Sequence, residues 1–213
     1  IMSEFEVVVL RPKKDEEEVR ELFRENFLTR EPTIQGLGAT PEDLMEFYLP
    51  VVQDCLNSDL CLGAKDKSSG ELVGVILNKA LTPADKTTFE GHWADSSNDK
   101  VRAIGNILYH AENDLDIFNK FNVEKVFELG IVTVCEHYLR RGIARLLIER
   151  SEQLGRNNGF QMINCQASNS SIQHILKDKG YDTYLTIDFS KNKDVDLSKT
   201  GETKGWLMMS LML

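Results

Sequence analysis

The hydrophobic and polar positions of the chain follow two periods, one typical of strands and one typical of helices. Strands are predicted by short apolar runs, which lie at residues 5–10, 60–64, 72–80, 126–134, 161–166, 181–189 and 206–213. Helices are predicted by apolar residues at helical spacing, which lie at 15–27, 41–56, 101–118, from Gly142 onward and at 168–179. The segments without a clear period are predicted as loops and span 28–40, 82–100 and 190–205, the last of them exposed.

This order of elements predicts an α/β fold with a mixed sheet that is covered by helices. Two strand-like runs flank the turn-forming residues 65–71, which predicts a β-hairpin. A chain of 213 residues is long enough for one substantial core and short for two. We therefore expect a single domain over residues 2–213.

Composition and charge narrow the classes of partner. Apolar residues make up 41% of the chain and charged residues 28%, which is typical of a folded globular protein. The formal net charge of -9 argues against nucleic acid as a partner, because phosphate binding requires clustered cations. An acidic field attracts cationic small molecules such as amines, although the same charge can serve solubility alone.

The cysteines and histidines suggest neither a metal site nor a disulfide framework. Cys55, Cys61, Cys135 and Cys165 show no C-x-x-C spacing, and the four histidines are scattered. No apolar run approaches about 18 residues, so we expect no membrane span. With no secretory apolar segment at its start, the sequence predicts reduced thiols and a cytoplasmic location.

Chemistry is indicated where the strand at 126–134 ends in a basic turn that opens a helix. The first turn of a helix offers free N–H groups and a positive dipole end, which together can hold a pyrophosphate. Gly142 lets a ligand approach the backbone, and Arg140, Arg141 and Arg145 add positive charge. The alternative is a solvated helix start whose arginines serve solubility, and spacing alone does not separate the two.

Residues 138–144 resemble motif A of the GNAT acetyltransferases, Arg/Gln-x-x-Gly-x-Gly/Ala. The match rests on Gly142 and Ala144, and the sequence departs from the motif at Leu139 and Arg140. Two flanking segments add to the resemblance. Residues 168–181 are similar to the family's Asn-containing helix that ends in Gly-Phe, and 126–134 are similar to its splayed strand.

The resemblance implies a GNAT fold, in which a mixed, mostly antiparallel sheet is flanked by helices and splays at the acetyl-CoA site. It implies acetyl-CoA as co-substrate, no metal, and oxyanion stabilisation by a backbone N–H of residues 132–134. The residues implied to bind acetyl-CoA are Val132, Thr133, Val134, Arg140, Arg141, Gly142, Ile143, Ala144, Arg145 and Asn169.

Residues 27–32 resemble the Glu-Pro motif of insect arylalkylamine N-acetyltransferases, and Asn78 also fits that subfamily. The resemblance gives Glu31 the role of general base, often through a water molecule. The chemistry needs such a group, because a primary amine has a pKa of about 10 and must lose a proton before it attacks a thioester. Without the resemblance, a solvated glutamate beside Pro32 would be the simpler interpretation.

The departing thiolate needs a proton, and many GNAT enzymes supply it from a tyrosine at the position that is Leu176 here. The insect subfamily uses two serines instead. Ser168 lies at one matching position, and the second aligns with Ile172, beside Ser171. Ser168 and Ser171 are therefore candidate acids, with helix capping as the alternative role for both.

The leading hypothesis is an enzyme that moves the acetyl group of acetyl-CoA directly to a small primary amine, such as dopamine, serotonin or tyramine. A polyamine, an amino acid or a protein lysine is the alternative acceptor. A CoA-binding protein without transferase activity is the alternative class, prompted by the altered motif and the absent tyrosine. The acceptor pocket is expected from segments 28–40 and 82–100, whose residues carry no readable specificity.

Overall fold

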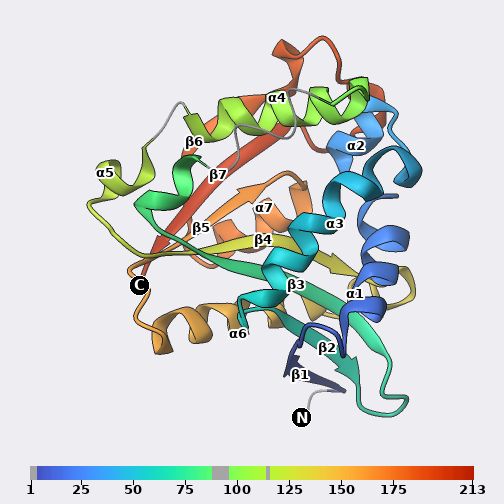
Figure 1. The fold of residues 1–213 in the computed structure, drawn as a ribbon, viewed down its shortest axis with the longest axis vertical. Helices are drawn as coiled ribbons and strands as arrows, with labels where there is room; N and C mark the ends of the chain where they lie inside the picture. Colours follow the sequence, from blue (N-terminus) through green and yellow to red (C-terminus); the bar gives the residue numbers. More distant parts are fainter. Residues whose placement is uncertain (1–3, 88–95, 114–115) are drawn as a thin grey trace.

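A mixed sheet lies at the centre of the fold (Figure 1). In the part of the chain that the computed structural model describes, residues 4–87, 96–113 and 116–213, seven strands form one sheet in the order β1-β2-β3-β4-β5-β7-β6. The strands are β1 (Phe5–Val9), β2 (Leu62–Asp66), β3 (Leu72–Leu81), β4 (Val126–Val134), β5 (Met162–Ala167), β6 (Asp182–Asp188) and β7 (Gly205–Met212). The pair of β4 and β5 is parallel and the other pairs are antiparallel, so the predicted α/β fold with a mixed, mostly antiparallel sheet is confirmed.

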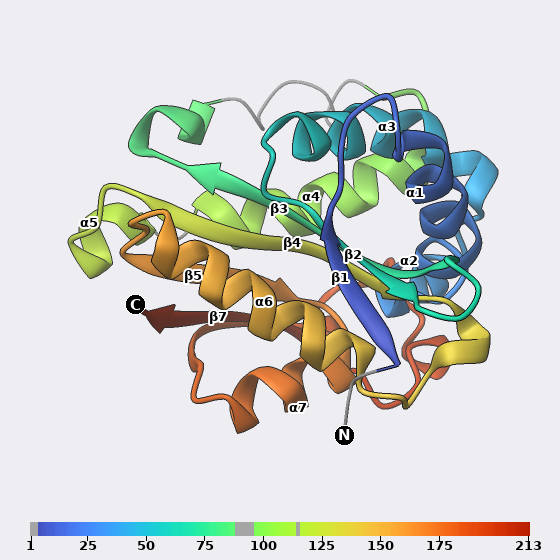
Figure 2. The same cartoon turned by 90° about the horizontal axis from the view of Figure 1, so that it is seen from below.

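Helices cover both faces of the sheet (Figure 2). One face carries α1 (Glu16–Leu22), the π-helical turn η1 (Phe23–Phe27), α2 (Pro32–Leu37), α3 (Pro41–Asn57) and α4 (Asp99–Asn113). The opposite face carries α6 (Ile143–Asn157) and α7 (Ser170–Asp178), while the short α5 (Ile117–Phe121) precedes β4. The short 3-10 turns are η2 (Pro83–Thr87), η3 (Glu136–Tyr138), η4 (Phe189–Lys191) and η5 (Leu197–Lys199).

The sequence pattern explains how these helices begin and what they bury. The Thr40 side chain and Asp43 form a capping box at the start of α3, with Pro41 in its first turn, as Ser/Thr-x-x-acid sequences favour. On α6, Ile143 and Leu147 lie one turn apart and are buried against the sheet. A separate hydrophobic core lies between the sheet and α1 to α4.

The two central strands separate along their length. Residues 126–129 of β4 pair with 162–165 of β5, and the pairing stops there. From that point β4 continues to Val134 against β3, and β5 continues to Ala167 against β7. The unpaired ends form the splay that the sequence resemblance implied.

Three expectations for the connecting segments are wrong. Segment 28–40 contains the helix α2, which spans 32–37 and is too short to show a helical period. The single helix expected at 101–118 is two helices, α4 and α5, because the Asp116 side chain caps a new start by accepting the Asn119 N–H. Residues 114–115 lie outside the described part, as do 88–95 of the expected loop 82–100.

The third correction concerns segment 190–205, which was expected to be an exposed turn. Val195, Thr200 and Thr203 are buried, and the Asp196 N–H donates to the Gly36 carbonyl at 2.8 Å. The charged residues between them hid these few inward positions from the pattern. The segment therefore packs against α2 and helps to fix its position.

Candidate active site

Glu31 is buried at the N-terminus of α2, where it is the helix cap. Its side chain is only 7% exposed, which excludes a solvated surface glutamate. The Ile34 N–H donates to Oε2 at 2.7 Å, as expected for a capping carboxylate, and the Thr33 hydroxyl donates to Oε1 at 2.9 Å. The sequence had predicted a loop at this position, so burial by a short capped helix is a finding of the structure.

Ser168 meets this carboxylate from the opposite end of the sequence. Ser168 directly follows β5, and its side chain lies close enough to Glu31 to lower the pKa of that carboxyl. The cap of α7 is Asn169, whose Oδ1 accepts the Ser171 N–H at 2.8 Å, so capping is not the role of Ser168. Ser171 is exposed in the first turn of α7. The structure thus brings one of the two candidate serines to Glu31.

We call Glu31, Thr33, Ile34 and Ser168 the Glu31 cluster. Burial raises the pKa of the Glu31 carboxyl above its usual range, and the hydrogen bonds from Ile34, Ser168 and Thr33 oppose that rise without cancelling it. A carboxyl whose pKa is raised, and whose oxygens still accept hydrogen bonds, is suited to accept and release a proton.

Aromatic rings from η1 and α3 pack beside the Glu31 cluster. Burial raises the pKa of the Tyr48 phenol, and the charge of the nearby Glu31 carboxylate raises it further. Its ring centroid lies 5.4 Å from that of Phe23, 6.1 Å from Phe27 and 5.1 Å from Phe47. Tyr48 therefore joins Glu31 to a group of packed aromatic rings.

Arg30 and Asn26 hold the Glu31 segment against the open end of β4. The Arg30 guanidinium donates to the Val134 carbonyl and, through Nε, to the Asn26 carbonyl at 2.9 Å. The Asn26 Oδ1 accepts the Glu136 N–H at 3.0 Å. Because Arg30 contacts the end of β4 and Glu31 contacts the residue after β5, this dipeptide spans the splay of the two strands.

The splayed part of β4 contains three of the predicted acetyl-CoA residues. Val132, Thr133 and Val134 pair with β3 along one edge. Their other edge lies beyond the point where β4 stops pairing with β5. Pairing with β3 shifts register at Gly130, whose bulge lies where β4 and β5 part. Unpaired backbone groups at this edge can hydrogen-bond an extended ligand arm.

We call residues 139–145, which follow η3 and include the first residues of α6, the basic turn. Gly142 caps α6 in the left-handed region with φ 80°, and Arg140 is also left-handed with φ 61°. The first helical hydrogen bond of α6 runs from the Leu146 N–H to the Gly142 carbonyl, so the N–H groups of Ile143, Ala144 and Arg145 have no helical partner. A Cβ at Gly142 would meet no atom within 4 Å, so the space beside Gly142 is open.

The three arginines of the basic turn differ in their partners. Arg141 donates to Glu4 at 2.7 Å and lies over the Phe5 ring, 4.9 Å from its centroid. Arg145 donates to Asp178 at 2.9 Å. Within the described residues, Arg140 has no ion pair and is exposed. Of the three, Arg140 has the charge that is most available to a phosphate group.

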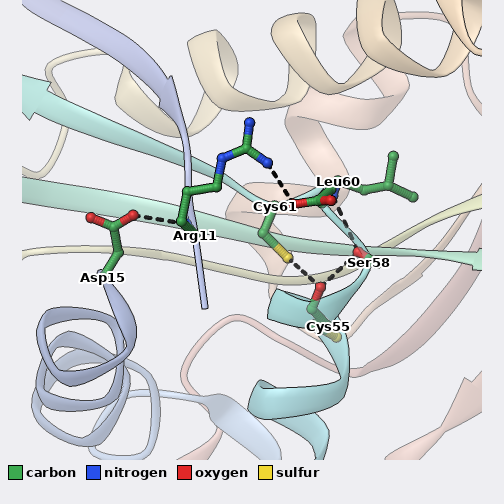
Figure 3. Close-up of polar contacts among 7 residues, drawn as sticks. Arg11, Asp15, Cys55, Ser58, Leu60 and Cys61 are labelled. Atoms are coloured by element: carbon green, nitrogen blue, oxygen red, sulfur yellow. Dashed lines mark hydrogen bonds and ion pairs between the residues drawn. The ribbon is translucent and has the colours of Figure 1, made fainter. Parts of the chain in front are cut away.

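Figure 3 shows a polar cluster at the end of α3, around two of the cysteines. The Cys61 thiol donates to the Cys55 carbonyl at 3.1 Å, and the Ser58 hydroxyl donates to the same oxygen at 2.6 Å. Burial raises the pKa of the Cys55 and Cys61 thiols, the latter to about 12. Burial likewise raises the pKa of Cys165 to about 12. These thiols stay protonated at neutral pH, so they serve packing and not nucleophilic catalysis.

Two absences among the described residues bear on metals and membranes. No group of three or more His, Cys, Asp or Glu residues there could hold a metal ion. Among the same residues, no helix is both long and apolar enough to cross a bilayer.

The sequence profile of the acetyltransferase (GNAT) family matches residues 17–181. That match covers most of the chain, including the Glu31 cluster and the basic turn, and the chain therefore belongs to the GNAT acetyltransferase family. Enzymes of this family take the acetyl group from acetyl-CoA. The open backbone donors of the basic turn and the splay of β4 from β5 fit such a ligand.

Solved structures of insect enzymes share this fold over nearly the whole chain. Arylalkylamine N-acetyltransferase 2 from Aedes aegypti aligns with a TM-score of 0.87 at 21% identity, covering 98% of both chains. A mosquito arylalkylamine N-acetyltransferase-like protein, 5b, aligns at 0.81 and 18%, covering 98% of this chain and 100% of that one. The Drosophila melanogaster polyamine N-acetyltransferase, which forms N-acetylagmatine, aligns at 0.82 and 16%, with coverage of 98% and 100%. At these identities the likeness establishes the fold.

Sequence reasoning missed four residues that the structure places around Glu31. Thr33 stands two positions after Glu31, and a polar residue in the first turn of a capped helix could have drawn attention to it. Arg30 was within the quoted Glu-Pro segment but had no predicted role. Tyr48 and Trp206 come close only through the fold, and no local signal marks them.

Proposed function

We propose that this chain transfers the acetyl group of acetyl-CoA directly to a small primary amine, with Glu31 as general base. The observation that carries the proposal is the Arg30-Glu31 dipeptide across the splay. Arg30 holds the end of β4, and Glu31 reaches the serine that follows β5. A base at the open end of the splay lies where an amine could meet a thioester aligned along β4.

In the proposed reaction the ammonium group first gives a proton to the ionised Glu31 carboxylate, directly or through water. The amine nitrogen then attacks the thioester carbonyl carbon, the C–N bond forms, and the C–S bond breaks with its electron pair on sulfur. A backbone N–H of residues 132–134 is proposed to stabilise the oxyanion.

The thiolate needs a proton, and the attacking nitrogen must lose its second one. The Ser168 hydroxyl is proposed to donate its proton to the sulfur and to be reprotonated by Glu31, which lies beside it. The carboxylate that this restores then takes the second proton from the nitrogen and releases it to water. Ser171 is exposed and is proposed to have at most an indirect part. No covalent enzyme intermediate is required.

Acetyl-CoA is proposed to bind through the basic turn and the free edge of β4. The N–H groups of Ile143, Ala144 and Arg145 would hold the pyrophosphate, with Gly142 leaving room and Arg140 adding charge. Arg141 and Arg145 already have exposed ion pairs, which are weak enough for a phosphate to compete with. Asn169 caps α7 in the structure, so its proposed contact with the cofactor would have to be made alongside that bond.

An arylalkylamine is the acceptor class that the surroundings of Glu31 support best. Tyr48 lies near Glu31, the half-buried Phe27 and Phe47 pack beside its ring, and aromatic side chains pack well against an aryl group. The amine end would then point toward the carboxylate. The two insect arylalkylamine N-acetyltransferases that share the fold agree with this choice.

A polyamine or guanidino amine is the second candidate acceptor. It is favoured by the net charge of -9 and by the shared fold of the Drosophila polyamine enzyme. A second cation on the acceptor would need its own acidic partner, and the aromatic rings around Tyr48 offer none. A non-catalytic CoA-binding protein is the third candidate, and the buried Glu31 at the open end of the splay, with its raised pKa, argues against it. We further propose a single domain over 2–213 and a cytoplasmic location.

The experiment that tests the proposal measures free-thiol release from acetyl-CoA with a panel of arylalkylamines, polyamines including agmatine, and amino acids. Turnover is expected with arylalkylamines above the others, and Glu31→Gln should lower it by about two orders of magnitude or more while acetyl-CoA still binds. Preferential turnover of agmatine would shift the proposal to the second acceptor class. Binding of CoA without turnover on any amine would overturn it.

A further inference from the structure

A hydrogen-bond chain of buried side chains leads from the last strand to Glu31. The Trp206 Nε1–H, at the start of β7, donates to the Thr33 Oγ1 at 2.7 Å. The Thr33 hydroxyl donates in turn to Glu31 Oε1 at 2.9 Å. Thr33 is 1% exposed and Trp206 is 6% exposed, so water does not compete for these bonds.

The order of donors in this chain is fixed by chemistry. An indole N–H can only donate, so Thr33 Oγ1 must be the acceptor of the Trp206 bond. A hydroxyl has one proton, and a carboxylate oxygen can only accept. With one lone pair of Thr33 occupied by Trp206, its proton is left to point at Glu31.

We propose that Thr33 and Trp206 are positioning residues for the general base: Trp206 sets the rotation of the Thr33 hydroxyl, and Thr33 holds the Glu31 carboxylate in its ionised form and in one orientation. The inference rests on the proposed function in that Glu31 is the base. The inference gives Thr33 and Trp206 a role in the proposed reaction, in which they otherwise have none.

Trp206 is itself held in place by close backbone contacts. A Cβ on Gly205 would lie 2.0 Å from the Ile187 carbonyl oxygen, so only glycine allows β7 to approach β6 at this point. Trp206 pairs with Ile187 in that approach. The Gln173 side chain donates to the Gly205 carbonyl at 2.8 Å and to the Ala167 carbonyl at 2.9 Å. Gln173 therefore links the backbone next to Trp206 to the end of β5, one residue before Ser168.

Other polar groups face Glu31 or its helix from each neighbouring element. From α3, the Tyr48 phenol is close enough for its pKa to rise with the Glu31 charge, and it is neutral at ordinary pH. On its own segment, Arg30 is directed to the Val134 carbonyl. Charged groups from α4 and η5 lie at the far, C-terminal end of α2 and comprise Lys100, Asp196 and Lys199. Thr33 and Ser168 are thus the side-chain donors that govern the carboxylate.

The test compares three variants with the wild-type chain. Thr33→Val keeps the shape and removes the hydroxyl, Thr33→Ser keeps the hydroxyl, and Trp206→Phe removes the indole donor. The readouts are the pKa of the Glu31 carboxyl, followed by NMR in protein with isotope-labelled glutamate and assigned with Glu31→Gln, and the acid limb of the kcat/KM profile.

Loss of a hydrogen bond to a charged group is expected to raise the Glu31 pKa by about one unit in Thr33→Val. The acid limb should move to higher pH by the same amount, with kcat/KM about tenfold lower below it and restored above it. Trp206→Phe should shift the same way by less, and Thr33→Ser should leave the limb in place. The double variant should match Thr33→Val alone, because Trp206 acts through Thr33.

An unchanged Glu31 pKa in Thr33→Val, or additive effects in the double variant, would overturn the inference. The NMR titration decides even if the chain acetylates no amine, since it needs no turnover. If Glu31→Gln retains full activity, the proposed function fails while the Thr33 shift can still be measured. If Trp206→Phe fails to fold, the comparison of Thr33→Val with Thr33→Ser decides alone.

Discussion

The polar groups of the basic turn are exposed, whereas those of the Glu31 cluster are buried and hydrogen-bonded to one another. At the basic turn the donors are backbone N–H groups, and the arginines either have exposed ion pairs or, like Arg140, have none among the described residues. At the Glu31 cluster, Ile34 and Thr33 both donate to one carboxylate, and Ser168 lies beside it.

This difference follows from what each region is proposed to recognise. A pyrophosphate keeps its charge in water and can be held by a helix start that tolerates solvent. A base must have a raised pKa, which burial supplies, and a buried carboxylate is stable only when its oxygens are hydrogen-bonded. The predictions below separate the two regions, from the largest expected effect to the smallest.

Glu31→Gln should have the largest effect. Loss of the base is expected to lower kcat/KM by about two to four orders of magnitude at neutral pH, because an amide cannot accept the amine proton. Steady-state thiol release measures it. Acetyl-CoA affinity, measured by calorimetry, should stay within about twofold, and a parallel loss of affinity would show that the two regions are not separate.

Gly142→Val should act on the basic turn alone. A β-branched residue is strained at φ 80°, and its side chain would stand before the free N–H groups, so acetyl-CoA affinity should fall about tenfold. Gly159→Val is the matched control, because Gly159 is also left-handed with open space around it but lies at the far end of α6. Equal loss of affinity in both variants would contradict the assignment of the basic turn.

Ser168→Ala should lower kcat/KM by roughly fivefold and move the acid limb to higher pH, because it removes one donor from the ionised Glu31. The pH profile of thiol release measures both effects. Ser171→Ala is the control, since Ser171 is exposed, and it should change neither. A larger effect from Ser171 than from Ser168 would reverse their proposed roles.

Arg140→Ala should have the smallest effect. An exposed charge contributes little to phosphate binding, so the KM for acetyl-CoA should rise about threefold, and the rise should shrink as salt is added. Arg141→Ala is the comparison, because Arg141 already pairs with Glu4. A greater salt-dependent rise in Arg141→Ala would show that Arg141, not Arg140, meets the phosphates.

The sequence predicted the parts of this molecule that depend on neighbours along the chain. The strand at 126–134 and the turn at Gly142 are read from local apolar runs and one glycine, and both appear in the structure. The prediction of an exposed turn at 190–205 was wrong, because the buried residues of this segment are few and lie singly among charged ones.

The surroundings of Glu31 could not be read locally in the same way. The resemblance pointed to Glu31 and Ser168, but their contact joins residues far apart in the chain, and so does the bond from Trp206 to Thr33. Burial of Glu31 also depends on α2, which is too short to leave a period. Such contacts are set by the packing of the sheet, which no single segment encodes.

The most direct test of the central claim is the pH dependence of kcat/KM for an arylalkylamine, in the wild-type chain and in Glu31→Gln. A base works when ionised, so activity should be lost as the pH falls through the Glu31 pKa, which burial raises above the ordinary value of 4.5. The account predicts that the wild type shows an acid limb in addition to the one caused by protonation of the amine. The residual activity of Glu31→Gln should lack this additional limb. The same limb in both proteins would contradict the role of Glu31 as general base.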